Sequence, residues 1–255
     1  MYTKDDDNTI YVRINDRRVK AGLEAINRLY ERKNQALEEL QGTLSRERDL
    51  VHLTNWQNGF RALTIVPEFP SECRIPFHRD TDLYFDQTKP KTIWGDPTRD
   101  RNQIAFVGQK QDAEQRFSIS EGGILHYSDV IEKDESVYSG DSPQDAVRLG
   151  RIEFVLTTVL PYAKTVLNHF GYFGNVHIVY RLGKIQDKFL SDWNHLPLSP
   201  RGTTGNMRAR YDEISIERQL SLDDIAEKLD DIVASILQEI CRGAFGFNVE
   251  EQWRQ

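Results

Sequence analysis

The sequence contains very few cysteines. Only Cys73 and Cys241 occur among its 255 residues, and neither belongs to a Cys-x-x-Cys pair. A chain of this length can bury a core that needs no disulfide staples. Two isolated thiols are typical of buried side chains in a reducing compartment, so we expect a cytoplasmic protein.

The sequence also lacks a long apolar run. Its strongest apolar stretch, residues 152–163, is interrupted by Glu153 and Pro161. It is far shorter than the ~20 residues that a membrane span requires. The first ten residues carry an acidic run instead of the apolar segment of a secretory signal. We therefore expect no membrane partner.

An excess of positive charge is missing as well. The chain has 33 Lys plus Arg against 40 Asp plus Glu, a formal net charge of -7. This balance excludes a protein that coats nucleic acid through bulk charge, although a local basic patch remains compatible with it. Aromatic residues are plentiful, with twelve Phe, ten Tyr and four Trp, and this favours a folded globular protein.

Residues 1–58 predict an N-terminal appendage made of a strand and a long helix. Apolar residues alternate over Ile10–Ile14, which predicts a short strand. From Arg17 to about Leu44, apolar residues follow the three-and-four spacing of an amphipathic helix. The segment Leu23–Leu44 could also pair two copies of the chain as a coiled coil, so a homodimer through this helix is one alternative.

Residues 59–255 predict an α+β unit with several strands. The alternation and the turn residues predict strands over Ala62–Val66, Ile104–Val107, Arg116–Ser120, Ile124–Val130, Val176–Leu182 and Glu213–Glu217. The second, third and fourth of these strands are expected to form an antiparallel meander, with Gly122–Gly123 in the turn before Ile124–Val130. Pro70–Pro97 contains four prolines and predicts a long loop with extended pieces around Leu83–Phe85 and Ile93–Trp94.

Two long amphipathic helices complete this unit. The first is expected to start at the capping signature Ser142–Asp145 and to end at Gly171. The second is expected to start at Ser221–Asp224 and to end at Gly243. The predicted fold class is therefore α+β: a mostly antiparallel sheet packed by two long amphipathic helices, with an N-terminal strand-helix appendage.

The segment from His78 to Asp86 is the most metal-like part of the sequence. In an extended segment, His78, Asp80 and Asp82 would point to one side, and Asp86 could add a fourth ligand. A metal-dependent hydrolase or nuclease built on these residues is one alternative function. Histidine, aspartate and threonine are also ordinary loop residues that bond to the local backbone, so the pattern does not require a metal.

A loop rich in arginine and glycine is the candidate phosphate-binding site. Its candidate contact residues are Arg201, Thr203, Thr204, Arg208 and Arg210. Arginine forks match phosphate oxygens, and glycines allow the backbone to approach them closely. The loop is no P-loop, because the lysine and the fixed glycine spacing are missing. A solvated surface loop would have the same composition.

The sequence contains no motif for nucleophilic catalysis. Neither a Gly-x-Ser-x-Gly pattern nor a cysteine-centred motif is present. The sequence makes no positive case for an enzyme, and we expect no cofactor.

Two groups of short motifs resemble a known family. Thr9–Arg17, followed by Ala25–Leu29, resembles the closing strand and following helix of the Alba-like DNA-binding domain of the Schlafen type. Ala62–Pro70, Gly174–Leu182 and Glu217–Gly246 resemble the C-terminal α+β region that often follows this domain in bacterial proteins. The part of the family domain with its acidic and lysine motif would precede Met1.

The resemblance implies an association with nucleic acid, and it carries over one residue, Arg13, as a phosphate contact. Our first hypothesis is a non-catalytic interaction or sensing module in a bacterial regulatory or defence protein. Its partner would be nucleic acid or a nucleic-acid-associated protein, contacted through Arg13 and the loop from Arg201 to Arg210.

Overall fold

A computed structural model of the chain describes residues 59–246, except 94, 101–102, 111–112, 132, 140–141 and 192–207. Before residue 59 it describes residues 3–4, 10–14, 17–20, 22, 27–28, 30–31, 34–35, 38, 41–43 and 45.

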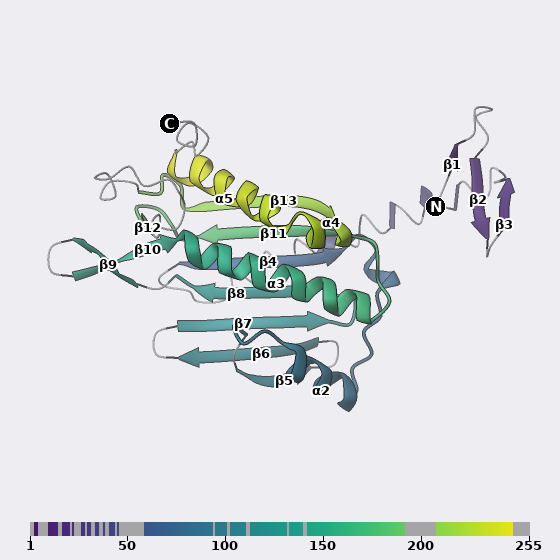
Figure 1. The fold of residues 1–255 in the computed structure, drawn as a ribbon, viewed down its shortest axis with the longest axis horizontal. Coiled ribbons are helices and arrows are strands. Elements are labelled where there is room, and N and C mark those ends of the chain that lie inside the picture. Colours follow the sequence, from purple (N-terminus) through teal and green to yellow (C-terminus); the bar gives the residue numbers. More distant parts are fainter. Residues whose placement is uncertain are drawn as a thin grey trace.

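A seven-stranded antiparallel sheet forms the centre of the fold (Figure 1). Its strands lie in the order β13-β11-β4-β8-β7-β6-β5. They are β4 (Phe60–Pro67), β5 (Asp96–Asp100), β6 (Gln103–Lys110), β7 (Ala113–Ser120), β8 (Leu125–Val130), β11 (Asn175–Gly183) and β13 (Glu213–Ser221). The predicted α+β class and mainly antiparallel sheet are confirmed, as are the six strands predicted in this unit.

The middle of the sheet is buried on both faces. Every residue of β4 is buried, and so are the last six residues of β11. The burial of both faces includes polar residues of these strands, such as Arg61, Thr64 and Arg181. The meander turn lies where it was predicted, and Gly123 adopts a φ of 72° there, a left-handed conformation that glycine accepts without strain.

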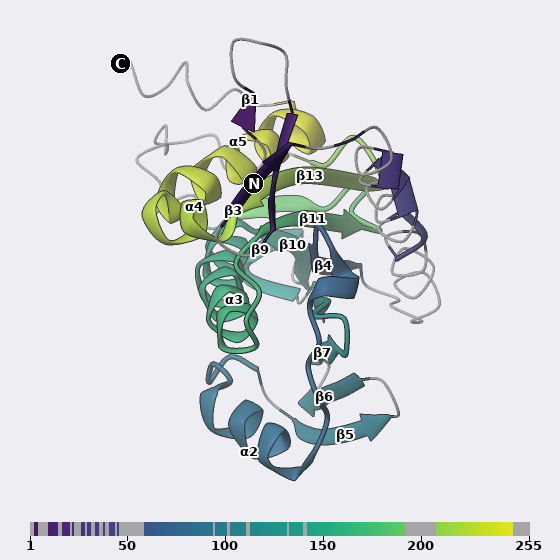
Figure 2. The ribbon, with the colours of Figure 1, turned by 90° about the vertical axis from the view of Figure 1, so that its right-hand side faces the viewer.

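Helices cover one face of the sheet. Figure 2 shows α3 (Leu149–His169) and α4 (Leu222–Glu227) on the same side of the strands, and α5 (Leu229–Phe245) packs against both α3 and β13. The apolar stripe of α3 is buried in the main core, and Gly171 follows its end with a φ of 83°. We call this side of the sheet the helix-covered face, and the opposite side the outer face.

The predicted start of the first long helix is wrong. Ser142–Arg148 forms strand β10, which pairs antiparallel with β9 (Lys133–Ser139) and parallel with β12 (Phe189–Ser191). The register of β9 and β10 shifts between Pro143 and Gln144, as at the bulges where strands tolerate proline. Strand pairing with distant residues therefore overrides the local capping signature, and α3 begins at Leu149.

The second long helix is interrupted. Ser221 caps α4 as predicted, because its Oγ accepts a hydrogen bond from the backbone N–H of Asp224 at 3.0 Å. The chain then turns at Lys228 before α5 begins. α5 ends at Phe245, with Gly246 as its C-cap at a φ of 70°, so the predicted end at Gly243 is wrong. Gly243 lies inside α5, where its lack of a side chain leaves room for Ile214 of β13.

The long loop predicted over Pro70–Pro97 is wrong in its middle. It contains a short 3-10 helix, η1 (Pro70–Glu72), and the helix α2 (Arg79–Thr88), so Leu83–Phe85 is helical and not extended. Thr81 and Phe85 lie four residues apart, one helical turn, and both are buried. The burial of this pair favours a helix. The surrounding prolines instead indicated a loop in the sequence.

The N-terminal strands form a separate small sheet. Its strands are β1 (Thr3–Lys4), β2 (Ile10–Ile14) and β3 (Arg17–Lys20), all antiparallel. The predicted strand at β2 is confirmed, whereas the helix predicted to start at Arg17 begins after β3. The described positions between 27 and 45 are helical, but most of Leu23–Leu44 lies outside the described residues. Among the helices that the structure describes, none has the length and apolar character to cross a membrane.

Candidate functional site

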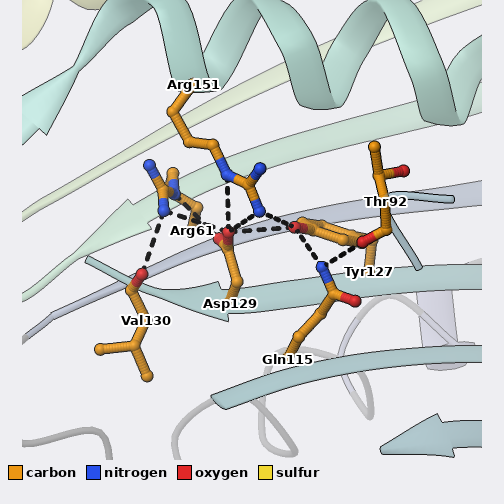
Figure 3. Close-up of polar contacts among 7 residues, drawn as sticks. All are labelled: Arg61, Thr92, Gln115, Tyr127, Asp129, Val130 and Arg151. Carbon is orange, nitrogen blue, oxygen red and sulfur yellow. Dashed lines mark hydrogen bonds and ion pairs between the residues drawn. The ribbon is translucent and has the colours of Figure 1, made fainter. Parts of the chain in front are cut away.

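A buried charged cluster lies on the helix-covered face, under the first turn of α3. The strand registers place Arg61 of β4 beside Asp129 of β8, and Asp129 beside Gln115 of β7. Tyr127 is the next residue on this face of β8, and Arg151 reaches down from α3 (Figure 3). Arg61 is 2% exposed and Asp129 is 4% exposed.

The carboxylate of Asp129 is the centre of the cluster. Arg61 donates to both of its oxygens, from Nε at 2.8 Å and from Nη2 at 3.0 Å. Arg151 donates to Oδ2 from Nη2 at 3.2 Å, and the Tyr127 hydroxyl donates to the same oxygen at 3.0 Å. Such charge-assisted bonds are among the strongest hydrogen bonds in proteins.

Neighbouring groups complete the hydrogen bonding of the cluster. Arg61 Nη2 also donates to the carbonyl oxygen of Val130 at 3.0 Å. Gln115 Nε2 donates to the Tyr127 hydroxyl at 3.0 Å and to the carbonyl oxygen of Thr92 at 2.8 Å. The network therefore joins β4, β7, β8, α3 and the segment before β5 (Figure 3).

Burial and charge shift the pKa values in this cluster. Burial alone would lower the pKa of Arg61, but the adjacent Asp129 carboxylate and its hydrogen bond raise it above the usual value. Burial also raises the pKa of Tyr127, and the negative charge of Asp129 adds to this effect. Tyr180 of β11, which pairs with Leu63 of β4, lies close enough to Arg61 to act on its charge, and burial raises the pKa of Tyr180 well above its usual value. The two tyrosines are therefore neutral, and Arg61 is charged, at physiological pH.

The geometry of the cluster suits a role in holding strands and helix together better than proton transfer by Asp129. Both oxygens of Asp129 already accept hydrogen bonds, and the side chain is 6% exposed. A general base must reach the proton that it removes. This cluster was not predicted from the sequence, although Arg61, a charged residue inside the apolar run of β4, is a signal that could have found part of it.

The structure does not bring the four predicted metal ligands together as expected. His78 is the N-cap of α2, where its Nδ1 accepts a hydrogen bond from the Thr81 N–H at 3.3 Å. Asp80 and Asp82 lie two residues apart on a helix, so they point in different directions. Asp86 forms an ion pair with Lys89 at 2.8 Å. Across the described residues, no three His, Cys, Asp or Glu side chains gather as a metal site.

The predicted arginine loop lies mostly outside the described residues, which exclude Arg201, Thr203 and Thr204. Its described end has local partners. Arg208 forms a β-bridge with Phe189, and its guanidinium lies over the Phe189 ring, 4.3 Å from the centroid.

Arg210, predicted as a phosphate contact, lies at the end of α5. Its backbone N–H donates to the carbonyl oxygen of Ala244 at 2.8 Å. Its guanidinium contacts Gly246, so tightly that a side chain at Gly246 would clash with it. A cation at the C-terminus of a helix offsets the partial negative charge there. Arg210 therefore has a structural contact that its sequence context did not reveal.

The register of β2 and β3 gathers basic residues around Arg13. Arg13 pairs with Arg18, and Tyr11 pairs with Lys20. Residues alternate between the two faces of a strand, so Arg13, Arg18 and Lys20 belong to one face, which we call the basic face. Arg17 falls on the other face. Arg18 and Lys20 were not predicted as contacts, because the apolar spacing after Arg17 indicates a helix there.

Comparisons with known proteins provide no relative for this chain. No protein-family model, no curated protein and no solved structure matches it.

Proposed function

We propose that this chain is a non-catalytic interaction module that binds nucleic acid through the basic face of β2 and β3. The observation that carries the proposal is the register, which sets Arg13 opposite Arg18 with Lys20 on the same face. Like charges at directly paired strand positions destabilise the pair. A phosphate backbone bound on this face offsets this repulsion, and arginine forks match phosphate oxygens.

Two further points support the proposal. The net charge of -7 means that affinity for a polyanion must come from a local patch and not from bulk charge. The resemblance of Thr9–Arg17 to the closing strand of a Schlafen-type DNA-binding domain assigns the same role to Arg13. We also propose a cytoplasmic location, since Cys73 and Cys241 are both buried free thiols.

Fluorescence anisotropy tests this function with labelled duplex DNA, single-stranded DNA and single-stranded RNA over a range of salt concentrations. We expect binding at low salt that weakens as salt rises. The logarithm of the association constant for duplex DNA should fall linearly with the logarithm of the salt concentration. The slope should be about 0.9 per phosphate contacted. The triple variant R13A/R18A/K20A should reduce this slope by about 2 to 3, because three contacts are lost.

Arg17→Ala is the matched control, because it removes the same charge from the other face of β3. It should leave the slope and the affinity nearly unchanged. Arg201→Ala and Arg208→Ala report separately on the arginine loop, and a loss of affinity there would extend the contact surface. Absence of binding to all three nucleic acids at low salt, or equal losses from Arg17→Ala and the triple variant, would contradict the proposal.

A further inference from the structure

A small hollow lies between β11 and β13, far along the sheet from β5. Its volume is about 130 Å³, and its described lining consists of His177, Ile178, Val179, Glu217, Arg218 and Gln219. The register pairs His177 with Gln219 and Val179 with Glu217. These four residues alternate with the core residues Ile178 and Ile216, so they belong to the outer face of the sheet.

The hollow is open to solvent on its β13 side. Glu217 and Gln219 are exposed, as is the neighbouring Ser215. On the outer face, the apolar part of its lining is the side chain of Val179, which is 8% exposed. A volume of about 130 Å³ holds several water molecules, each of which occupies roughly 30 Å³ in the liquid. It therefore has room for one small polar group with the methylenes that carry it.

Negative charge dominates around the hollow. Glu217 lines it, and the Glu68 carboxylate lies next to it, accepting hydrogen bonds from Gln219 Nε2 at 3.1 Å and Asn175 Nδ2 at 3.0 Å. The one cation in the described lining, Arg218, already has partners within the chain. Its Nη2 donates to Glu239 of α5, and its Nη1 donates to the carbonyl oxygen of Glu217 at 2.8 Å.

His177 supplies an unused polar atom. Its Nε2 is buried and has no hydrogen-bond partner in the described part of the chain. Burial lowers the pKa of the imidazole, although Glu68 and Glu217 act in the opposite direction. The neutral ring accepts a hydrogen bond at Nε2 in the tautomer that carries its proton on Nδ1. A buried polar atom without a partner is unusual and calls for a ligand or a water molecule.

We propose that this hollow binds the ammonium or guanidinium head of a lysine or arginine side chain from a partner protein. Glu217 would pair with the cation, His177 would accept one of its hydrogen bonds, and Val179 would contact the methylene stem. The small volume fits one charged head on an apolar stem, which a basic side chain provides. This inference is independent of nucleic-acid binding by the basic face.

Nuclear magnetic resonance titrations test the proposal on the full chain. The probes are N-acetyl-lysine methylamide and N-acetyl-arginine methylamide, with N-acetyl-norleucine methylamide as an uncharged probe of similar length. We expect both basic probes to shift the His177 imidazole nitrogens and the β13 amides saturably at millimolar concentration. The norleucine probe should cause no saturable shift. Glu217→Gln should weaken binding about tenfold, which corresponds to the loss of one charge-assisted hydrogen bond.

Glu227→Gln is the matched control, since it removes an exposed carboxylate from α4 outside the described lining. It should leave binding within about twofold of the parent chain, because the charge it removes is screened by solvent. Equal shifts from the norleucine probe, equal losses from the two glutamate variants, or no saturable shift at all would overturn the proposal. Tighter binding of spermidine than of both amino-acid probes would also overturn it, by assigning the hollow to a free polyamine.

Discussion

At the scale of single residues, Arg61 and Asp129 form a buried ion pair in the sheet. Two guanidinium groups share one carboxylate, and Arg61 and Asp129 are almost fully buried. Desolvating two charges costs free energy, which their mutual attraction and additional hydrogen bonds offset only when the geometry is good. Here the carboxylate meets Arg61 through two parallel bonds, and the Tyr127 hydroxyl and Arg151 complete its hydrogen bonding.

Asp129→Asn should therefore destabilise the protein strongly. It leaves the Arg61 charge buried without its counter-charge, which typically costs about 3–5 kcal/mol. Equilibrium urea unfolding followed by circular dichroism measures this loss. Arg151→Met is the comparison, because the Arg151 side chain is 28% exposed and its removal leaves the Arg61 pair intact. A loss of less than about 1 kcal/mol for Asp129→Asn would show that the pair is not a structural centre.

His126 makes stability depend on pH. Burial lowers its pKa to about 4, and the nearby Arg116 and Arg181 add to this effect. The unfolded chain binds a proton near pH 6.5, whereas the folded chain resists protonation until about pH 4. The contribution of His126 to stability is therefore complete above pH 6.5 and is lost as the pH falls towards 4.

The expected loss over this interval is on the order of 3 kcal/mol, from the shift in pKa. Urea unfolding at pH 7 and at pH 4 measures it, with His126→Gln as the variant that lacks the titrating group. The variant should lose less stability than the parent chain between the two pH values. Equal losses would mean that His126 does not titrate with a lowered pKa, as a direct titration of its ring protons can confirm.

Sequence patterns at the residue scale identified the right chemistry in only a few places. The cap at Ser221 was predicted, because its partner Asp224 is three residues away and the contact is local. The cluster around Asp129 was not, because Arg61 is 68 residues from its partner. Nothing in the local pattern of either strand indicates which distant side chain will lie opposite.

At the scale of elements, the turn before β8 illustrates how one glycine serves two needs. Gly123 has a φ of 72°, and an added Cβ would collide with Cys73 Sγ and approach Leu167 within 2.9 Å. Gly171, after α3, has a comparable φ of 83°, but an added Cβ would meet nothing within 4 Å. Substitution of Gly171 therefore tests the cost of the backbone conformation alone. Substitution of Gly123 tests this cost together with the cost of a steric clash.

Gly171→Ala should cost about 1–2 kcal/mol, which is the usual penalty for a left-handed conformation in a residue with a side chain. Gly123→Ala should cost more than this, by roughly 1–3 kcal/mol, because it adds an overpacked contact in the core. Thermal unfolding of both variants provides the comparison. Equal changes in melting temperature would mean that Cys73 and Leu167 move aside freely.

The elements predicted wrongly share one cause. α2 and β10 depend on contacts with distant residues, through Phe85 in the core and through the pairing of β10 with β12. Local sequence signals favoured a loop where α2 forms and a helix start where β10 forms. By contrast, β11 and the apolar stripe of α3 carry patterns long enough to be unambiguous; β11 was predicted correctly, and α3 was predicted correctly apart from its start.

At the scale of the whole molecule, the order of the strands sets where the fold is most stable. β4 pairs with β11 and β8 and is buried along its whole length. β5 lies at the edge of the sheet, pairs only with β6 among the described strands, and contains Pro97, which has no N–H to donate. Charges and proline are common means of blunting an edge strand.

Hydrogen exchange should follow this order. Amides of β4 and β11 should exchange most slowly, near the rate set by global unfolding, and those of β5 should exchange at least tenfold faster. Exchange followed by mass spectrometry of peptic fragments measures both. Comparable protection of β5 and β4 would indicate an additional element that covers the β5 edge.

The sequence by itself determined the fold class, six of the seven strands of the large sheet and the approximate positions of the two main helical segments. Their apolar periodicity and several of their turn residues are local properties of the chain. Only the tertiary structure decided that Arg61, Asp129 and Arg151 meet, that Arg18 and Lys20 share a face with Arg13, and that His177 lies beside Glu217. Those neighbours belong to different strands and helices, and their pairing follows from strand register and helix packing, which no short stretch of sequence encodes.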